Sequence, residues 1–503
     1  MPHYVVICTY MNSDVAGVEK VDSLEVGQRI LCGNRWVRVS QDLADAFEPG
    51  DRLIALQESG ELLRITSSDQ QLAHEAVSNA SHAFTLLSEV SDEQISLFYK
   101  KFATFLQDDD LFRYVQVAND QDVEKALEKG RSVTRLRIDA KMRSDMVEGL
   151  LMWSRLELAR DLVMNTVEHD GWDVEVVRSP LGVVGFVFEG RPNVFADATG
   201  VLRTGNTVVF RIGSDALGTA RAISQHMLAP ALGAAGLPEK AVVLIDSPTH
   251  GAGWALFAHT GLSLAIARGS GKAVAQLGAV ARQSGIAVSL HGTGGAWMIL
   301  GDSADADEVT SHVLYSLDRK VCNTLNVVAM NNGTSAQNIQ AVLNGISASA
   351  TQRGTQAIVH VSKASQYLFG SCVIPDNLDI RWEDNIDYSH EYEWENVPEL
   401  ALYFGSDIHE CVETFNAHSP QFVVSCLSQD QNDHDLVWRK CNAPFVGNGF
   451  TRWVDGQYAL KRPELGLSNW QGGRLLGRGG VLSGDGVHTI RLRAKQTDHD
   501  VHR

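Results

Sequence analysis

From residue 174 onward, the chain alternates short β-branched runs with Ala-rich stretches that have the length of helices. The runs are VEVVR, LGVVGFVF, TVVFR, AVVLID, LSLAIA and IAVSL. A second set, WMILGD, LNVVAM, AIVHVS, LALYFGS and FVVSCLS, extends from residue 297 to about residue 437. Near-continuous apolar runs separated by helices are typical of parallel strands that are buried on both faces. The alternation therefore predicts an α/β protein with doubly wound parallel sheets.

Residues 1–72 have a different pattern, which predicts a small β-rich domain. The strand-like runs YVVICTYM, RILCGNRWVRVS, DRLIALQ and ELLRIT are separated by the turn signals NSD, GN, EPGD and SG. The period then becomes helical. It predicts amphipathic helices over residues 71–106 and, after the start signal ANDQD, over residues 123–162.

Composition narrows the class of protein. The formal net charge of −18 argues against nucleic acid or an anionic membrane as the main partner. The seven cysteines are scattered, no two closer than fifteen residues, so neither a disulfide framework nor a CxxC motif is predicted. No run of eighteen apolar residues occurs, and no Lys or Arg precedes the apolar residues 4–11. We therefore expect a cytoplasmic protein without a signal peptide.

A glycine-rich turn is the first candidate for a cofactor site. RGSGKAV, residues 268–274, follows a predicted strand and opens a predicted helix. It lacks the spacing of a Walker A loop, and a tight structural turn is one interpretation. In the alternative interpretation, the N-terminus of this helix binds a pyrophosphate. The residues in contact with the pyrophosphate would then be Gly269, Ser270, Gly271 and Lys272.

Arg211 and Cys322 are the other candidates for chemistry. Arg211 ends the apolar run in GNTVVFRIGSD, a position suited to a ribose 2′-phosphate, and a surface ion pair with Asp215 is the alternative. Cys322 lies in LDRKVCNTLNVV, where Arg319 and Lys320 would favour the nucleophilic thiolate. An inert core cysteine is the alternative, because most lone cysteines before an apolar strand are of that kind.

The segment FEGRPNVFADATGVLRTGNTVVFRIGSDA, residues 188–216, resembles the hallmark segment of the γ-glutamyl phosphate reductases, or glutamate-5-semialdehyde dehydrogenases, of the aldehyde dehydrogenase superfamily. Similar segments follow the order of that family: ANDQDVEKALEKG, SPLGVVGFVFE, VCNTLNVV, NGFTRWVDG, and ELGLS with LLGRGG. The resemblance implies two Rossmann-like domains and an oligomerisation element. We expect an NADP-binding domain at residues 73–296, a catalytic domain at residues 297–445, and a return to the cofactor domain with an oligomerisation strand at residues 446–503.

The resemblance also implies a reaction. An acyl phosphate, γ-glutamyl 5-phosphate or a close analogue, would be reduced by NADPH to the semialdehyde through a thioester on Cys322, with release of phosphate. Asn193, together with the backbone N–H of Cys322, would bind the developing oxyanion. Arg211, Ser214 and the turn 269–272 would contact the cofactor. The residues expected to bind substrate are Arg191, Asn323, Asn326, Thr451 and Arg452.

The chain departs from the pattern of the family at several points. Ser289 stands where hydrolytic members of the superfamily have a general-base Glu, which suits acyl transfer to phosphate rather than to water. Asn326 replaces an acidic residue near the nucleophile, and Lys320 and Val321 replace Pro-Gly. SNWQGGR, residues 468–474, also differs. A non-glutamyl acyl phosphate or a CoA thioester as substrate, and a catalytically inactive binding paralogue, therefore remain alternatives.

Three titratable residues remain without a clear counterpart in the family pattern. Glu393 and Glu395 could supply the usual acidic residue of the catalytic domain, but neither falls in register. His291 is either an acid–base group or a structural histidine.

The resemblance implies a homodimer or a larger assembly, in which the strand-like VHTIRLRA, residues 487–494, is the exchanged element. Residues 1–72 have no counterpart in the family pattern and could recruit a protein partner. The His-bearing end TDHDVHR suits a solvated terminus, so no metal site is predicted.

Overall fold

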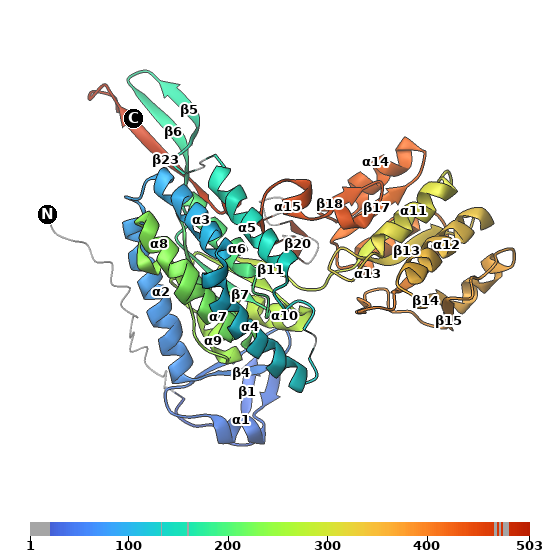
Figure 1. The fold of residues 1–503 in the computed structure, drawn as a ribbon, viewed down its shortest axis with the longest axis horizontal. Helices are drawn as coiled ribbons and strands as arrows, with labels where there is room; N and C mark the ends of the chain where they lie inside the picture. Colours follow the sequence, from blue (N-terminus) through green and yellow to red (C-terminus); the bar gives the residue numbers. More distant parts are fainter. Residues whose placement is uncertain are drawn as a thin grey trace. The chain divides into compact units, whose positions relative to one another are not determined.

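The computed structural model describes residues 21–131, 133–157, 160–466, 470–471, 474–475 and 482–502. The chain divides into two compact units, Met1–Gln71 and Leu72–Arg503. The predicted strand YVVICTYM and most of the segments SNWQGGR and LLGRGG lie outside the described residues. Figure 1 shows the order of the helices and strands along the chain.

The first unit contains two antiparallel strand pairs. Strand β1 (Arg29–Cys32) pairs with β2 (Arg35–Arg38), and β3 (Arg52–Ala55) pairs with β4 (Leu62–Ile65). These strands confirm the predicted runs in the described part of this region. The short helix α1 (Gln41–Ala46), which the pattern did not indicate, begins at Ser40, whose hydroxyl accepts the N–H of Leu43 at 3.3 Å.

Four helices follow: α2 (Ser67–Leu87), α3 (Asp92–Gln107), α4 (Asp109–Glu128) and α5 (Ala140–Arg155). The helix start predicted at ANDQD is wrong, because α4 begins after its N-cap residue Asp108 and continues through this segment. Asn119 does not cap a helix there. Its buried side chain hydrogen-bonds to the backbone of the connection between α4 and α5, which interrupts the helix predicted over residues 123–162.

The first parallel sheet has the strand order β11-β10-β7-β8-β9. Its strands are β7 (Val183–Phe188), β8 (Thr207–Ile212), β9 (Val242–Leu244), β10 (Leu264–Arg268) and β11 (Val288–His291). The chain starts at the central β7, winds outward through β8 and β9, and then adds β10 and β11 on the other side. The direction of winding changes between β7 and β10, and ligands of such sheets bind at the carboxyl ends of the strands at this point.

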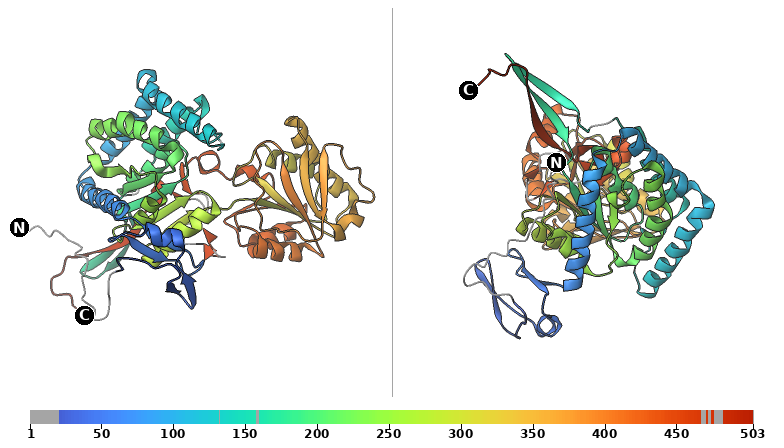
Figure 2. Two further views of the ribbon diagram at one scale, coloured as in Figure 1. Left: turned by 90° about the horizontal axis from the view of Figure 1, so that it is seen from below. Right: turned by 90° about the vertical axis from the view of Figure 1, so that its left-hand side faces the viewer.

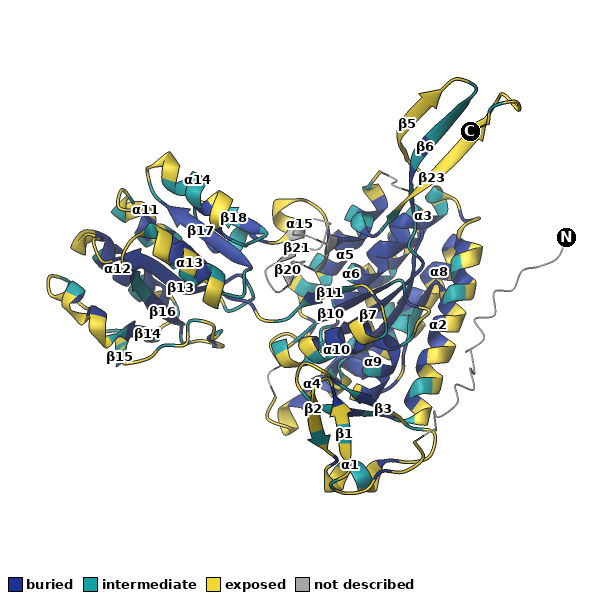
Figure 3. Ribbon diagram, turned by 180° about the vertical axis from the view of Figure 1, so that it is seen from behind, coloured by how far each residue is buried: buried dark blue, intermediate teal, exposed yellow. Residues whose placement is uncertain are grey.

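Helices cover this sheet and are packed on it by buried side chains. They include α6 (Val194–Ala198), α7 (Leu217–Ile223), α8 (Ala229–Ala235), α9 (His250–Phe257) and α10 (Gly271–Gln283). Every residue of β7 and β8 is buried. Dark blue marks the buried residues in Figure 3. Trp153 of α5 is fully buried and donates its indole N–H to the carbonyl oxygen of Ala196 at 2.9 Å. This contact fixes α6, which begins directly after Asn193.

The second parallel sheet has the strand order β15-β14-β16-β13-β12-β17-β18. Its strands are β12 (Ala296–Leu300), β13 (Leu325–Asn331), β14 (Ala357–Ser362), β15 (Leu378–Glu383), β16 (Glu399–Gly405), β17 (Val423–Leu427) and β18 (Phe445–Gly447). Its helices include α11 (Ala306–Ser316), α12 (Ala336–Gln352), α13 (Ile408–His418) and α14 (Gln431–Lys440). The two parallel sheets confirm the predicted α/β class.

A third, antiparallel sheet consists of β5 (Val163–His169), β6 (Trp172–Ser179) and β23 (Thr489–Gln496). The run VEVVR therefore forms part of this sheet and not of a parallel one, and the assignment that the alternation gave it is wrong. Glu175 of β6 ion-pairs with Arg493 and Lys495 of β23, at 2.6 Å in the pair with Arg493. Figures 1 and 2 show the three strands extending as a ribbon beyond the neighbouring helices.

Towards its end, the second unit has a short helix and two short strand pairs. Helix α15 (Gly456–Ala459) precedes β19 (Glu464–Gly466) and β22 (Leu482–Ser483), which pair with each other, and β20 (Trp470–Gln471) pairs with β21 (Arg474–Leu475). Among the described residues, no helix combines the length and the apolar character that are needed to cross a membrane.

Candidate functional site

Cys322 lies in a tight turn directly before β13. The turn is closed by Thr324, whose Oγ1 donates to the carbonyl oxygen of Arg319 at 2.6 Å and accepts the N–H of Val321 at 2.9 Å. The Cys322 side chain is partly buried and packs against an apolar cluster that includes Phe422. The position of the thiol is therefore set by a hydrogen-bonded turn rather than by a flexible loop.

The other cysteines of residues 297–445 differ from Cys322. Burial raises the pKa of Cys411, Cys426 and Cys441 to about 12, which keeps these thiols protonated and inert. Burial also raises the pKa of Cys372. All the cysteines in the described part of the chain are free of disulfide bonds.

The connection between the two parallel sheets crosses the Cys322 turn. The N–H of Gly295 donates to the carbonyl oxygen of Cys322 at 2.7 Å. A Cβ atom on Gly294 would lie 2.6 Å from the Cα atom of Cys322, so only glycine permits this approach. The connection and the turn therefore form one packed structure.

Glu391 joins the same two segments through its carboxylate. One oxygen accepts the N–H of Gly294 at 2.5 Å, and the other binds the Nζ of Lys320 at 2.5 Å. The Lys320 side chain is only 5% exposed, so this ion pair is buried. The charge of Lys320, which the sequence suggested would favour the thiolate, is thus paired with a carboxylate. Sequence reasoning considered Glu393 and Glu395 and missed Glu391, whose 2.5 Å pair with Lys320 is closer than the 3.8 Å pair of Glu393 with the same ammonium.

Thr451 and Arg452, the candidates from NGFTRWVDG, hold the turn from another side. The Thr451 hydroxyl donates to the carbonyl oxygen of Asn323 at 2.7 Å, and the side chain is completely buried. Arg452 binds the side chains of Asn323 and Asp318, with 2.6 Å between its Nε and Asp318. The Asn323 amide also donates to the carbonyl oxygen of Val454 at 2.6 Å. Substrate binding by these residues stays a prediction, since their observed hydrogen bonds position the turn.

Asn326 also makes hydrogen bonds that position the neighbouring backbone. Its amide donates to the carbonyl oxygen of His390 at 2.8 Å, and its Oδ1 accepts the N–H of Tyr392 at 3.0 Å. The segment that carries Glu391 is therefore fastened to β13 on both sides of this residue.

Arg191 and Asn193 lie after β7, at the carboxyl edge of the first sheet. Arg191 ion-pairs with Glu189. Burial lowers the pKa of Arg191, and the charge of Cys322 acts in the opposite direction. Asn193 lies at the start of α6, and its Oδ1 is buried without a hydrogen-bond partner. Arg191 and Cys322 are thus brought within electrostatic reach of each other from different sheets.

Arg268 and His291 end the neighbouring strands β10 and β11 and are register partners. Arg268 lies 3.5 Å from the carboxylate of Asp197 in α6. Burial lowers the pKa of His291 to about 3, assisted by the nearby cations of Arg268, Arg191 and Arg135. The imidazole is therefore neutral at every working pH. Its ring centroid lies 5.6 Å from that of Phe422, which links this edge to the apolar cluster at Cys322.

The residues predicted to contact the cofactor lie at the same carboxyl edge. Arg211 is buried and donates to the carbonyl oxygen of Pro248 at 2.9 Å, and Asp215 is paired with Arg131, so the alternative of an Arg211–Asp215 pair is wrong. Ser214 is exposed after the end of β8. Ser270 is the N-cap residue of α10, where its side chain makes no capping hydrogen bond.

Glycines allow protein segments to pack closely at this edge. A Cβ atom on Gly213 would lie 2.8 Å from the backbone nitrogen of Gly190, and one on Gly271 would lie 2.5 Å from the hydroxyl of Thr293. Gly269 and Lys272 flank the start of α10, and the N–H groups in the first turn of a helix have no acceptor within the helix itself. This helix start therefore has donor groups that suit the phosphates of a dinucleotide.

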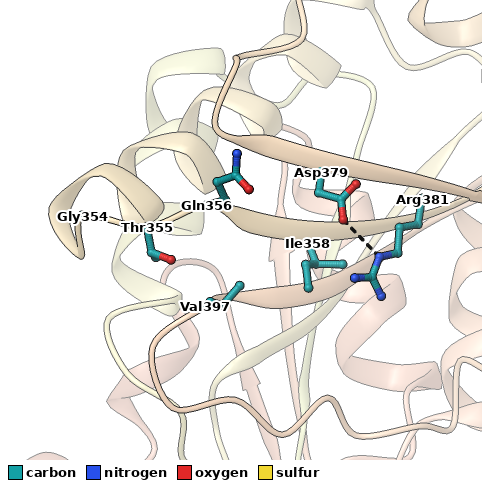
Figure 4. A pocket seen from close by; sticks show the side chains of 7 residues that line it. All are labelled: Gly354, Thr355, Gln356, Ile358, Asp379, Arg381 and Val397. Atoms are coloured by element: carbon teal, nitrogen blue, oxygen red, sulfur yellow. Dashed lines mark hydrogen bonds and ion pairs between the residues drawn. The ribbon is translucent and has the colours of Figure 1, made fainter.

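A cavity of the second parallel sheet lies away from these residues. It has a volume of about 670 Å³ and is lined by residues at the amino ends of β14, β15 and β16, as Figure 4 shows. Its charged residues Asp379 and Arg381 bind each other at 3.2 Å. None of the residues placed at the Cys322 turn or at the carboxyl edge lines it, so we assign it no role. Among the described residues, no group of three or more His, Cys, Asp or Glu side chains could hold a metal ion.

Asp197 gives the site a pH-dependent stability. Burial raises the pKa of Asp197 to about 6, and Asp455 acts in the same direction against Arg268 and Arg191. The folded protein therefore keeps this proton up to about pH 6, whereas the unfolded chain releases it near the ordinary value of 3.8. The stability that Asp197 contributes is complete at acidic pH and decreases by about 3 kcal/mol as the pH rises through 6.

We expect Asp197→Asn to remove this dependence. As the pH rises from 4 to 7, the variant should gain up to about 3 kcal/mol of unfolding free energy relative to the wild type. Urea unfolding at a series of pH values measures it, with the exposed Asp110→Asn as the control. A pH-independent difference would refute the assigned protonation of Asp197.

Known proteins share this fold and much of this sequence. A sequence profile of the Aldehyde dehydrogenase family matches residues 54–354. Gamma-glutamyl phosphate reductase 1 of Bacillus licheniformis is 26% identical over 409 residues, which cover 79% of this chain and 89% of that protein. The crystal structure of gamma-glutamyl phosphate reductase from Thermotoga maritima is similar with a TM-score of 0.73 and 22% identity, over 86% of this chain and 100% of that chain.

An engineered glycolyl-CoA reductase with bound NADP⁺ is also similar, with a TM-score of 0.57, 15% identity, and coverage of 86% of this chain and 98% of that chain. These structural likenesses show the fold. The family profile covers more than half of the chain, from β3 to the end of α12. The chain therefore belongs to the aldehyde dehydrogenase family.

Proposed function

We propose that this protein reduces an acyl phosphate, γ-glutamyl 5-phosphate or a close analogue, to the corresponding semialdehyde with NADPH. The observation that carries the proposal is the similarity of the chain to γ-glutamyl phosphate reductases over most of its length. The electrostatic interaction between Arg191, after β7, and Cys322, before β13, supports it. A nucleophilic thiol beside a cation suits an anionic acyl donor.

The side chains of the site suggest how the chemistry divides among them. The Cys322 thiolate attacks the acyl carbon, the C–S bond forms, the C–O bond to phosphate breaks, and its electron pair leaves with the phosphate. Asn193 and the backbone N–H of Cys322 would donate hydrogen bonds to the oxyanion of the tetrahedral intermediate. Ser289, which stands in place of a general base, cannot activate water efficiently, so the thioester is protected from hydrolysis.

The first sheet would hold the cofactor. We assign its pyrophosphate to the start of α10, with Gly269, Ser270, Gly271 and Lys272, and its ribose to the end of β8, with Arg211 and Ser214. When bound, the reduced nicotinamide supplies a hydride to the acyl carbon. The aldehyde then leaves and Cys322 regains its thiolate. In this assignment, residues 73–296 form the NADP-binding domain, residues 297–445 the catalytic domain, and residues 446–503 return to the first with the oligomerisation strand.

The reverse reaction tests the proposal. Purified protein with glutamate 5-semialdehyde, inorganic phosphate and NADP⁺ should produce NADPH in a phosphate-dependent manner. A panel of other aldehydes, and CoA in place of phosphate, identifies the acyl donor. If the protein is folded but none of the aldehydes in the panel supports reduction of NADP⁺, the proposed activity is contradicted.

Arg211 provides a test of cofactor choice. If its guanidinium binds the 2′-phosphate, Arg211→Ala should raise the KM for NADPH by about 10- to 100-fold and change that for NADH little, because hydrogen bonds to charged groups contribute about 1.5–3 kcal/mol. The comparison is kcat/KM for the two cofactors. Arg131→Gln, which removes the surface pair with Asp215 nearby, is the control. Equal losses with both cofactors would exclude the role.

A further inference from the structure

Arg191 and His291 each bury a nitrogen atom that no hydrogen bond satisfies. In the described part of the chain, the Nε of Arg191 and the Nδ1 of His291 have no partner. Buried polar atoms of this kind are uncommon and call for an explanation, such as a ligand that the site is built to receive.

The two nitrogens belong to strand ends that hydrogen bonds fix together. Arg268 of β10 lies between them. Its carbonyl oxygen accepts the N–H of Glu189 at 3.0 Å, and the N–H of Gly269 donates to the carbonyl oxygen of His291 at 3.2 Å. Arg191, two residues after Glu189, and His291 therefore both lie at the carboxyl edge, where the winding of the sheet changes direction, and they interact electrostatically.

Among the described residues, the cations that act on Arg191 and His291 outnumber the carboxylates. The guanidinium groups are those of Arg135, Arg191 and Arg268, and the carboxylates are those of Glu189 and Asp197. Two of the ion pairs, Arg135–Glu189 and Arg268–Asp197, are loose at 3.5 Å. Because all three cations act on the neutral imidazole of His291, the cluster is electrostatically prepared for an anion.

The cluster lies beside the nucleophile. Arg191 and Cys322 interact electrostatically, and His291 contacts Phe422 of the apolar cluster against which Cys322 packs. An anion bound between Arg191 and His291 would therefore lie next to the acyl group that Cys322 attacks. Guanidinium N–H groups are among the preferred partners of phosphate oxygens.

We propose that Arg191 and His291 form a binding subsite for a tetrahedral phosphate, the phosphoryl group of the acyl phosphate, with Arg268 as a second cation. The inference rests on the proposed function and deepens it. As the C–O bond breaks, negative charge grows on the departing phosphate oxygen, and the N–H of Arg191 and the imidazole of His291 hydrogen-bond to the phosphate. In the reverse direction, the same groups hold inorganic phosphate for attack on the thioester. No proton or electron beyond those of the proposed reaction is needed.

Binding of inorganic phosphate to the full chain tests the subsite directly. The protein is saturated with NADP⁺, so that the phosphate positions of the cofactor are filled, and phosphate is titrated by calorimetry and by its protection of Cys322 from iodoacetamide. The wild type should bind phosphate and be protected. Arg191→Gln and His291→Phe should each weaken binding by about 10- to 100-fold. Arg191→Lys keeps the charge and loses the Nε donor, so its affinity for phosphate should lie between those of the wild type and Arg191→Gln.

Arg113→Gln is the matched control, because Arg113 forms an exposed pair with Asp110 far from this edge in sequence and should leave binding unchanged. Circular dichroism verifies folding, and His291→Gln serves if another variant fails to fold. In the reverse assay, the variants should raise the KM for phosphate more than that for aldehyde. Absence of phosphate binding by the NADP⁺-saturated wild type, or a KM effect on aldehyde alone, overturns the subsite. Phosphate binding without turnover on any aldehyde would instead refute the proposed function.

Discussion

Cys322→Ala should abolish reduction of NADP⁺ by aldehyde and phosphate, with a loss of at least about 10³-fold in kcat/KM. The variant lacks the atom that forms the thioester, and the neighbouring groups cannot replace it. Without the thiolate, the oxyanion donors and the anion site have no covalent intermediate to stabilise. Mass spectrometry of protein quenched during turnover should show an acyl adduct on the wild type and none on the variant.

Cys372→Ala is the matched control for Cys322→Ala. Cys372 is also a free, partly exposed thiol of the catalytic sheet, and its Sγ lies 3.6 Å from the carbonyl oxygen of Ala336. This variant should keep wild-type activity and the adduct. More than a few per cent of wild-type activity in Cys322→Ala would disprove the assignment of the nucleophile.

Glu391→Gln should have the second-largest effect, on stability and on activity together. It leaves the buried ammonium of Lys320 without its close carboxylate partner, and breaking such a pair costs about 3–5 kcal/mol. The same change disturbs the hydrogen bond to Gly294, which supports the connection across the Cys322 turn. We expect a lower midpoint of urea unfolding and a lower kcat, with the KM for cofactor changed little.

Two further variants separate charge from packing at Glu391. Glu393→Gln removes a carboxylate that is 69% exposed and 3.8 Å from Lys320, and it should cost less than about 1 kcal/mol. Adding Lys320→Met to Glu391→Gln removes the unpaired cation and keeps an acceptor for Gly294, so it should recover most of the lost stability. A double variant as unstable as Glu391→Gln alone would mean that the ion pair is not the cause.

The strands of the parallel sheets could be predicted because both of their faces are buried, which gives uninterrupted apolar runs. Edge strands lack this signal. LDIRWE forms β15 at the edge of the second sheet, where exposed and buried residues are mixed, and the pattern did not reveal it. The assignment of β6 failed for a different reason. Its partner β23 lies far away in sequence, and no local periodicity distinguishes an apolar strand of a parallel sheet from one of an antiparallel sheet.

The candidate site was predictable where a single residue carries the chemistry. Cys322 and Arg191 were candidates from the segments that contain them, and the two interact electrostatically in the structure. Their roles in the reaction stay predictions. Glu391 was missed because its role arises from tertiary contact with Lys320 and Gly294, and the nearby Glu393 and Glu395 are equivalent to it in the sequence. The strongly shifted pKa of Asp197 has a similar origin, since burial sets it and composition gives no sign of burial.

The pairing of β6 with β23 has a consequence for synthesis of the chain on the ribosome. The β5–β6 hairpin is translated about 310 residues before the strand that completes its sheet. Throughout that interval, the unpaired edge of β6 is open to strands of neighbouring nascent chains. The pairing of Glu175 with Arg493 and Lys495 favours the correct late strand by charge. A chain that loses residues 489–496 would keep this edge open permanently, so premature termination near the end of translation should yield an aggregating protein.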